Sequence, residues 1–115
     1  MSEITSVIRA VIVGTKFAGS QGLEAIRQMR VGDAVQLQRE NHPRDANAVR
    51  CYFRTPGSDV FCGYVPKVAN PQLAAAMDAG AAPQAIVERA PVLRDGHGGT
   101  WVKIEPLLRI TWEPA

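Results

Sequence analysis

Seven side chains suited to contacts with a nucleic acid lie in short segments near the ends of predicted strands and helices. They are four cations, two aromatic rings and one carboxylate: Lys16, Arg39, Arg44, Lys67, Phe17, Tyr64 and Asp45. Phosphate groups attract cations, and every base has a face that can stack on an aromatic ring. If these segments meet at one end of a barrel, they form a site for a single nucleic-acid strand.

The sequence offers little for catalysis or for a metal site. Its two histidines are His42 and His97, and His42 with Asp45 is the combination that could act as an acid and base pair, although a loop histidine beside proline is more typical of a turn. Cys51, Cys62 and His42 offer three zinc-type ligands without CxxC or HxxxH spacing. The sequence also lacks a phosphate-binding loop with Gly-Lys-Ser/Thr. We therefore expect a non-enzymatic protein without a metal or another cofactor.

The composition is that of an ordinary globular domain. The 115 residues are 46% hydrophobic and 21% charged, with 13 Lys and Arg against 11 Asp and Glu. The formal net charge of +2 is too small to indicate a DNA-binding protein by itself. Apolar runs fall far short of the roughly 20 residues that a membrane helix needs, and no secretory signal is visible. We expect one domain over residues 1–115, in the cytoplasm, with reduced cysteines.

Hydrophobic periodicity predicts strands over much of the chain. The first is rich in β-branched residues, and two later runs flank the turn at Pro56-Gly57 and form a hairpin. In that hairpin Cys51 lies opposite or nearly opposite Cys62. The six predicted strands cover residues 4–13, 33–39, 48–54, 59–65, 85–92 and 100–111.

Two short helices are predicted between these strands. Residues 21–29 carry apolar side chains three positions apart, as expected for an amphipathic helix. In the second helix, Asn70 is expected to cap the first turn, Pro71 to occupy the first helical position and Gly80 to end it. Short strands, two small helices and frequent Gly or Pro favour a mainly β fold, an antiparallel barrel of about six strands.

The sequence around these residues resembles the HIRAN domain family, in content and in order, over residues 11–80. HIRAN domains occur at the front of fork-remodelling DNA translocases and as short stand-alone bacterial proteins, and this chain resembles the stand-alone type. The resemblance implies a modified OB-like barrel of about six strands with two helices. It rests most strongly on Arg39-Glu40, Pro43, Asp45, Asn47-Ala48-Val49 and Gly63-Tyr64-Val65-Pro66-Lys67.

The same resemblance implies recognition of the end of a single DNA strand, and in particular of its free 3' hydroxyl. By this resemblance Asp45 accepts a hydrogen bond from the 3' hydroxyl, while Lys16 and Lys67 contact phosphate. Phe17 stacks on a terminal base, and Tyr64 lies close by in the pocket. A carboxylate accepts a hydrogen bond from a hydroxyl but repels a 3' phosphate, so these roles are physically consistent.

Two positions depart from the family pattern. His42 stands where the end-binding members carry Asn, and Arg44 stands where they carry an aromatic residue that stacks on DNA. The guanidinium group of Arg44 can itself stack on a base. Structural alternatives remain for the other residues: Asp45 and Asn47 are also typical turn formers, the cations suit a solvated surface, and the aromatic rings suit packing.

We therefore predict a non-enzymatic module that binds single-stranded DNA at free 3' ends, in DNA repair or replication. The alternative is a protein-interaction barrel that recruits a helicase or a nuclease and binds DNA weakly or not at all. The low net charge and the departure at Arg44 favour that alternative. The oligomeric state is not indicated by the sequence.

Overall fold

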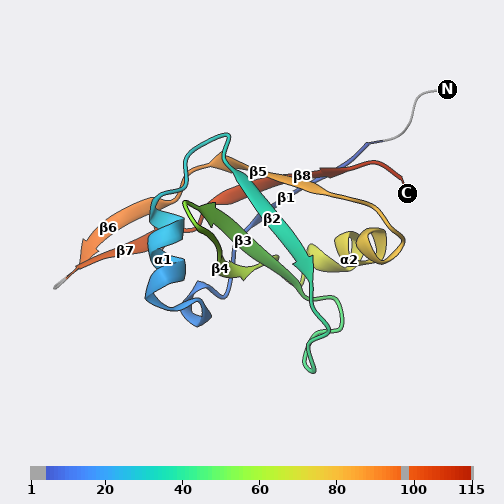
Figure 1. Cartoon of the computed structure of the whole chain (residues 1–115), viewed down its shortest axis with the longest axis horizontal. Helices are drawn as coiled ribbons and strands as arrows, with labels where there is room; N and C mark the ends of the chain where they lie inside the picture. Colours follow the sequence, from blue (N-terminus) through green and yellow to red (C-terminus); the bar gives the residue numbers. More distant parts are fainter. Residues whose placement is uncertain (1–4, 97–98, 115) are drawn as a thin grey trace.

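The computed structural model describes residues 5–96 and 99–114, and within them the chain is mainly β with two short helices (Figure 1). The predicted fold class is therefore confirmed. The elements in chain order are β1 (Ser6–Val11), the 3-10 helix η1 (Thr15–Phe17), α1 (Gly19–Arg27), β2 (Ala34–Arg39), β3 (Val49–Thr55), β4 (Ser58–Tyr64), α2 (Asn70–Asp78), β5 (Gln84–Arg89), β6 (Val92–Gly96), β7 (Gly99–Ile104) and β8 (Leu107–Trp112).

The C-terminal third of the chain differs from the prediction. The stretch 85–92, predicted as one strand, is divided between β5 and β6, and the stretch 100–111 is divided between β7 and β8. Each break contains a proline, Pro91 in the first and Pro106 in the second. Proline has no N–H group to donate to a strand ladder, so both breaks have the same physical cause. The predicted glycine-rich connection includes residues 97–98, which lie outside the described residues.

Six strands form one antiparallel sheet in the order β1-β8-β5-β2-β3-β4, and β6 pairs with β7 in a separate two-stranded ribbon. In Figure 1 this ribbon extends away from the main sheet. No continuous ladder joins the edge strands β1 and β4 in the described residues. Instead, Val13, just after β1, and Tyr64, at the end of β4, exchange two backbone hydrogen bonds of 2.9 and 2.8 Å. The edges of the sheet therefore meet at one point.

Gly63 permits this close approach. Its φ of +148° lies in a region that side chains rarely adopt, and a Cβ atom there would lie 2.6 Å from the carbonyl oxygen of Val13 and 2.6 Å from Ile12 Cγ2. Any larger residue would push the end of β1 away from β4. The glycine is thus required for the contact between the two sheet edges.

The core is formed by the alternate, inward-facing positions of the strands and by one face of each helix. Burial of these apolar groups is the main stabilising contribution to the fold. The largest fully buried hydrophobic side chains include Ile12, Ile26, Val49, Leu73, Val87, Leu108 and Ile110. No helix in residues 5–96 and 99–114 is long and apolar enough to cross a membrane.

The two cysteines belong to this core as free thiols. Cys51 pairs with Gly63, and the register shifts next to it, so that Cys62 is nearly opposite Cys51 as predicted. The Cys62 thiol donates to the carbonyl oxygen of Cys51 at 3.3 Å. Burial raises the pKa of Cys62 to about 12 and raises that of Cys51 well above its ordinary value. Both thiols therefore stay protonated at neutral pH.

We expect both cysteines to resist alkylation in the folded protein. Iodoacetamide reacts with the thiolate form of cysteine. The raised pKa values of Cys51 and Cys62 disfavour that form, and burial also keeps the reagent away from the thiols. Mass spectrometry after timed exposure at mildly alkaline pH should find unmodified protein, whereas protein unfolded in guanidinium should be labelled at both positions. Rapid labelling of the folded protein would show that the β3–β4 hairpin opens more readily than the structure indicates.

Candidate nucleic-acid interface

Six of the eight predicted site residues line one cavity of about 620 Å³ beside the point where the sheet edges meet. Three connections converge there: the chain after β1, the loop between β2 and β3, and the chain that leads from β4 into α2. The convergence expected from the sequence therefore occurs. The six residues are Phe17, His42, Arg44, Asp45, Tyr64 and Lys67, and Val13, Gly14, Ala48 and Val65 complete the lining.

Asp45 organises the loop between β2 and β3. Its Oδ1 accepts a hydrogen bond of 2.9 Å from the backbone N–H of Asn47, and its Oδ2 accepts one of 2.8 Å from Nδ2 of Asn70. The predicted role of Asp45 as a turn former is therefore present in the structure. Each carboxylate oxygen has two lone pairs, so these bonds leave capacity to accept from a ligand.

Asn70 does not have the role expected from the sequence. The residue that caps α2 is Ala69, and no side chain makes a capping hydrogen bond at this end. The Asn70 side chain is 1% exposed and donates to Asp45 instead. The Asn-Pro pair suggested a local cap, and no local sequence signal indicates a partner 25 residues away.

The Asp45 carboxylate is ionised at neutral pH. Burial acts to raise its pKa, but the hydrogen bonds from Asn47 and Asn70 and the positive charge of Lys67 outweigh burial and hold the pKa below the ordinary value. His42 acts in the same direction as Lys67. At neutral pH the cavity thus contains an anion beside cations, which suits a hydroxyl group linked to a phosphodiester.

His42 and Arg44 form a tight turn before Asp45. The backbone N–H of Arg44 donates to Nδ1 of His42 at 3.0 Å, and the N–H of Asp45 donates to the carbonyl of His42 at 3.1 Å. The imidazole therefore supports the loop as well as lining the cavity. The Arg44 guanidinium is exposed and has no hydrogen-bond or ion-pair partner among the described residues, so its flat face is available to a base.

Phe17 presents an uncovered aromatic ring at the edge of the cavity. It lies in η1, which follows Gly14 in the left-handed conformation (φ 69°), and the side chain is 70% exposed. The Lys16 ammonium lies 5.1 Å from the centre of the Phe17 ring. Lys16 itself is not part of the cavity lining, but it places positive charge at the rim. A ring this exposed is not explained by packing, so it favours stacking on a ligand.

Tyr64 forms one wall and is held from behind. Its ring packs edge-on against Phe61, with ring centres 5.3 Å apart. Burial and the carboxylate of Glu40 raise the pKa of the Tyr64 phenol, while the Arg50 guanidinium acts against them. Tyr64 is therefore a fixed, neutral surface of the cavity at ordinary pH.

Arg39, the remaining predicted contact residue, has structural partners instead of a place in the cavity. Its guanidinium donates to both carboxylate oxygens of Asp78 at 2.9 and 3.1 Å, and to the carbonyl oxygens of Ala46 and Ala48 at 2.9 and 2.8 Å. The same contact lowers the pKa of Asp78. Arg39 thus fixes the β2–β3 loop to α2, which positions Asp45 indirectly.

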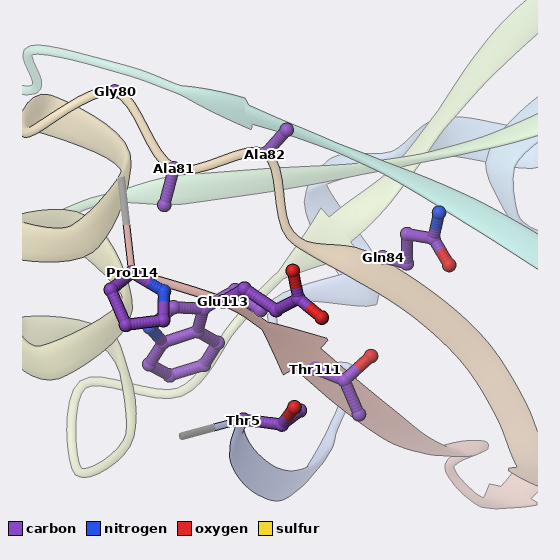
Figure 2. Close-up of a pocket in the computed structure, with 9 residues that line it drawn as sticks. Thr5, Gly80, Ala81, Ala82, Gln84, Thr111, Glu113 and Pro114 are labelled. Atoms are coloured by element: carbon purple, nitrogen blue, oxygen red, sulfur yellow. The ribbon is translucent and has the colours of Figure 1, made fainter. Parts of the chain in front are cut away.

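A second hollow, of about 440 Å³, lies between the end of β8 and the chain that leads into β5 (Figure 2). Thr5, Gln84 and Thr111 give it a polar wall, and Glu113 is the charged residue of its lining. It contains none of the predicted site residues. The larger cavity contains Arg44 and Lys67 beside the exposed ring of Phe17, so it is the better nucleic-acid site.

The protein has an antiparallel sheet and, where the sheet edges meet, a cavity lined by cationic side chains and an exposed aromatic ring. These features define a small OB-like binding domain. Residues 6–110 match the HIRAN domain family, and the chain belongs to it. The resemblance found in the sequence is therefore confirmed, and it extends beyond residues 11–80.

Solved structures agree with this assignment of the fold. A crystal structure of a protein from Lactobacillus plantarum is similar with a TM-score of 0.71 and 22% identity, over 99% of this chain and 100% of that chain. The HIRAN domain of human HLTF is similar with a TM-score of 0.63 and 19% identity, over 95% of this chain and 76% of that chain. No curated protein gives a significant match.

The zinc-type ligands considered in the sequence do not form a cluster. In residues 5–96 and 99–114, no three side chains of His, Cys, Asp or Glu lie close enough together to hold a metal ion. Cys51 and Cys62 face the core, whereas His42 lines the cavity.

Proposed function

We propose that the cavity around Asp45 binds the free 3' end of a single DNA strand, and that the protein is a non-enzymatic binding module in DNA repair or replication. Membership of the HIRAN family supports nucleic-acid binding. The proposal that the protein recognises a 3' end rests on the Asp45 carboxylate. This group is held charged inside a cavity that also contains Lys67 and the exposed ring of Phe17.

In this proposal each group has one task. The terminal base stacks on Phe17, and Lys67 and Lys16 neutralise the phosphates that enter the cavity and pass its rim. Asp45 accepts a hydrogen bond from the terminal hydroxyl and repels a terminal phosphate. The guanidinium face of Arg44 stacks on a base in place of an aromatic ring.

Fluorescence anisotropy with short labelled DNA strands that differ at one end tests the proposal. We expect a strand with a 3' hydroxyl to bind more tightly than the same strand with a 3' phosphate, and more tightly than a blunt duplex. Raising the salt concentration should weaken binding, because Lys67 and Lys16 displace counterions from phosphate. Equal affinity for all three ends would contradict the proposal and leave a strand-binding domain without end recognition.

We expect Phe17→Ala to lower the affinity for a 3' hydroxyl strand about tenfold or more, because stacking of one base on an aromatic ring contributes about 1–3 kcal/mol. The ring is 70% exposed, so the melting temperature should change little. Val31→Ala is the matched control, since Val31 is 68% exposed and lies outside the cavity. Wild-type affinity of the Phe17 variant would remove this ring from the site.

The β6–β7 ribbon supports a second candidate function. Val92, Leu93 and Ile104 expose large apolar side chains there, and such surfaces often contact another protein. A protein partner such as a helicase or a nuclease fits this feature. A pull-down that recovers the partner equally well after nuclease treatment, and loses it with Leu93→Glu, would favour recruitment over direct DNA binding.

A further inference from the structure

We propose that the outer face of β2, β3 and β4 is a second contact surface for the same DNA strand and binds the nucleotides that precede its terminal one. This proposal rests on the proposed function, since it extends the strand beyond the cavity. It concerns five residues outside the cavity lining. They are Gln36, Gln38, Arg50, Tyr52 and Phe61.

The register of the sheet places these side chains in two rows across three strands. Gln38 pairs with Arg50, and Arg50 pairs with Tyr64. In the next row, Gln36 pairs with Tyr52, and Tyr52 pairs with Phe61.

The burial pattern shows that these rows lie on the outer face of the sheet. Val35, Val49, Cys51 and Phe53, which alternate with the row residues along β2 and β3, are buried. Gln36 and Gln38 are exposed, whereas the aromatic rings and Arg50 are partly exposed. Figure 1 shows the three strands side by side.

The aromatic rings of this face are continuous with the cavity. Tyr64 lines the cavity, its ring centre lies 5.3 Å from that of Phe61, and Phe61 lies 5.8 Å from Tyr52. Arg50 covers the Phe61 ring, with its guanidinium carbon 5.1 Å from the ring centre. A strand that leaves the cavity past Tyr64 therefore meets further flat groups on which bases can stack.

The spacing of the rows suits an extended single strand. Adjacent rows are two residues apart along β3, which is about 6.8 Å. This is about twice the 3.4 Å rise between stacked nucleotides of one strand. Each row thus has room for one unstacked nucleotide, and the exposed amides of Gln36 and Gln38 can donate to and accept from base edges.

The charges on this face favour contact with bases over contact with phosphates. Arg50 forms an ion pair with Glu40 at 2.8 Å and donates to the hydroxyl of Tyr52 at 3.0 Å. In the next row along the hairpin, Arg54 pairs with Asp59. Because both arginines are neutralised, the affinity gained on this face should depend less on salt than the affinity gained in the cavity.

A peptide is a less suitable occupant than a nucleic acid. Peptides that bind sheets as added strands use the free backbone groups of an edge strand. β2 and β3 are interior strands with partners on both sides, and α1 and η1 pack against the edge strand β4, so this face offers mainly side chains. Flat rings and amides match the flat faces and polar edges of bases.

A length series tests the proposal. Thymidine di-, tetra- and octanucleotides, each with a 3' hydroxyl or a 3' phosphate, are titrated against the wild type, Tyr52→Ala and Val7→Ala. Val7→Ala is the control, because Val7 is exposed, pairs with Thr111 of β8 and belongs neither to the two rows nor to the cavity lining. For the wild type we expect affinity to rise with length. Tyr52→Ala should lower octanucleotide affinity about tenfold and leave dinucleotide affinity unchanged.

A second variant guards against a folding defect in Tyr52→Ala. The double substitution Gln36→Ala and Gln38→Ala alters exposed groups alone, and it should lower octanucleotide affinity several-fold. The proposal is overturned if affinity does not rise with length, or if the folded variants bind the octanucleotide as the wild type does.

The same data separate this proposal from the proposed function. The preference for a 3' hydroxyl over a 3' phosphate in the wild type reports on Asp45 and the cavity. The length-dependent effect of Tyr52→Ala on affinity reports on the outer face, and it can be measured with a 3' hydroxyl or with a 3' phosphate. If the end preference is absent while the length dependence remains, end recognition fails and the outer face is still a binding surface.

Discussion

Gly63→Ala is expected to lower the free energy of unfolding by roughly 3 kcal/mol or more. The added Cβ would lie 2.6 Å from the carbonyl oxygen of Val13, and backbone atoms at this point cannot move away independently of the sheet. The positive φ adds roughly 1–3 kcal/mol of strain for a residue with a side chain. Equilibrium unfolding in urea, analysed for midpoint and slope, measures the loss.

Gly57→Ala is the matched control for this substitution. Gly57 also has a positive φ, +97°, but a Cβ atom there would meet nothing within 4 Å. It should therefore show the backbone strain alone, about 1 kcal/mol. Equal losses in both variants would show that the close approach of Gly63 to Val13 tolerates a side chain, which would contradict this prediction.

The second large effect is expected for Asp45→Ala. The substitution removes the acceptor for Nδ2 of Asn70, whose side chain is 1% exposed, and an unsatisfied buried donor costs about 1–3 kcal/mol. It also removes the negative charge, so a 3' phosphate should bind as well as a 3' hydroxyl. Asp45→Asn keeps one acceptor oxygen and places an amide NH2 group where the second oxygen accepted, so it should retain only part of the stability while losing the discrimination between ends. Anisotropy and urea unfolding on the same preparations separate the two effects.

Asp59→Ala is the control for the loss of one carboxylate. Asp59 is an exposed residue that pairs with Arg54 on the hairpin, away from the cavity. This variant should retain the end preference. Equal loss of preference in both variants would show that net charge, and not the position of Asp45, determines which end is bound.

The pH dependence of the end preference follows from the same carboxylate. The folded-state pKa of Asp45 lies below its ordinary value of 3.8, so its stabilising contribution is present above that value and is lost as the pH falls through the folded-state pKa. We therefore expect the preference of Asp45 for a 3' hydroxyl to persist from neutral pH down to about pH 4. A partial decline near pH 6 is expected from the 3' phosphate itself, whose second pKa is about 6, whereas complete loss of the preference there would indicate a group other than Asp45.

Local sequence patterns predicted most of the fold because their causes are local. The alternation over 33–39 became β2, and the turn at Pro56-Gly57 became the β3–β4 hairpin. The strands that were joined incorrectly each ran across a proline, Pro91 or Pro106, although proline is itself a local signal against a strand interior. In those stretches the β-branched residues on both sides of each proline favour one continuous strand, whereas the missing N–H group of the proline interrupts it.

The cavity was predicted as a set of residues, and its supporting contacts were not. Cations and rings in loops indicate a ligand by their chemistry, so Phe17, Asp45 and Lys67 could be selected. The partners that hold the site together are distant in sequence, as in the contact of Arg39 with Asp78 and that of Asn70 with Asp45. Such pairs depend on how α2 lies against the β2–β3 loop, and no spacing in the sequence specifies this.

The two backbone hydrogen bonds between Val13 and Tyr64 link the occupancy of the cavity to the stability of the domain. Both residues belong to the cavity lining, so a ligand in the cavity contacts both edges of the sheet and stabilises the contact between them. A ligand that binds the folded state but not the unfolded state stabilises the protein by about 2.7 kcal/mol when the ligand concentration is a hundred times its Kd. If the proposed function is correct, a strand with a 3' hydroxyl should therefore raise the thermal transition of the protein more than the same strand with a 3' phosphate.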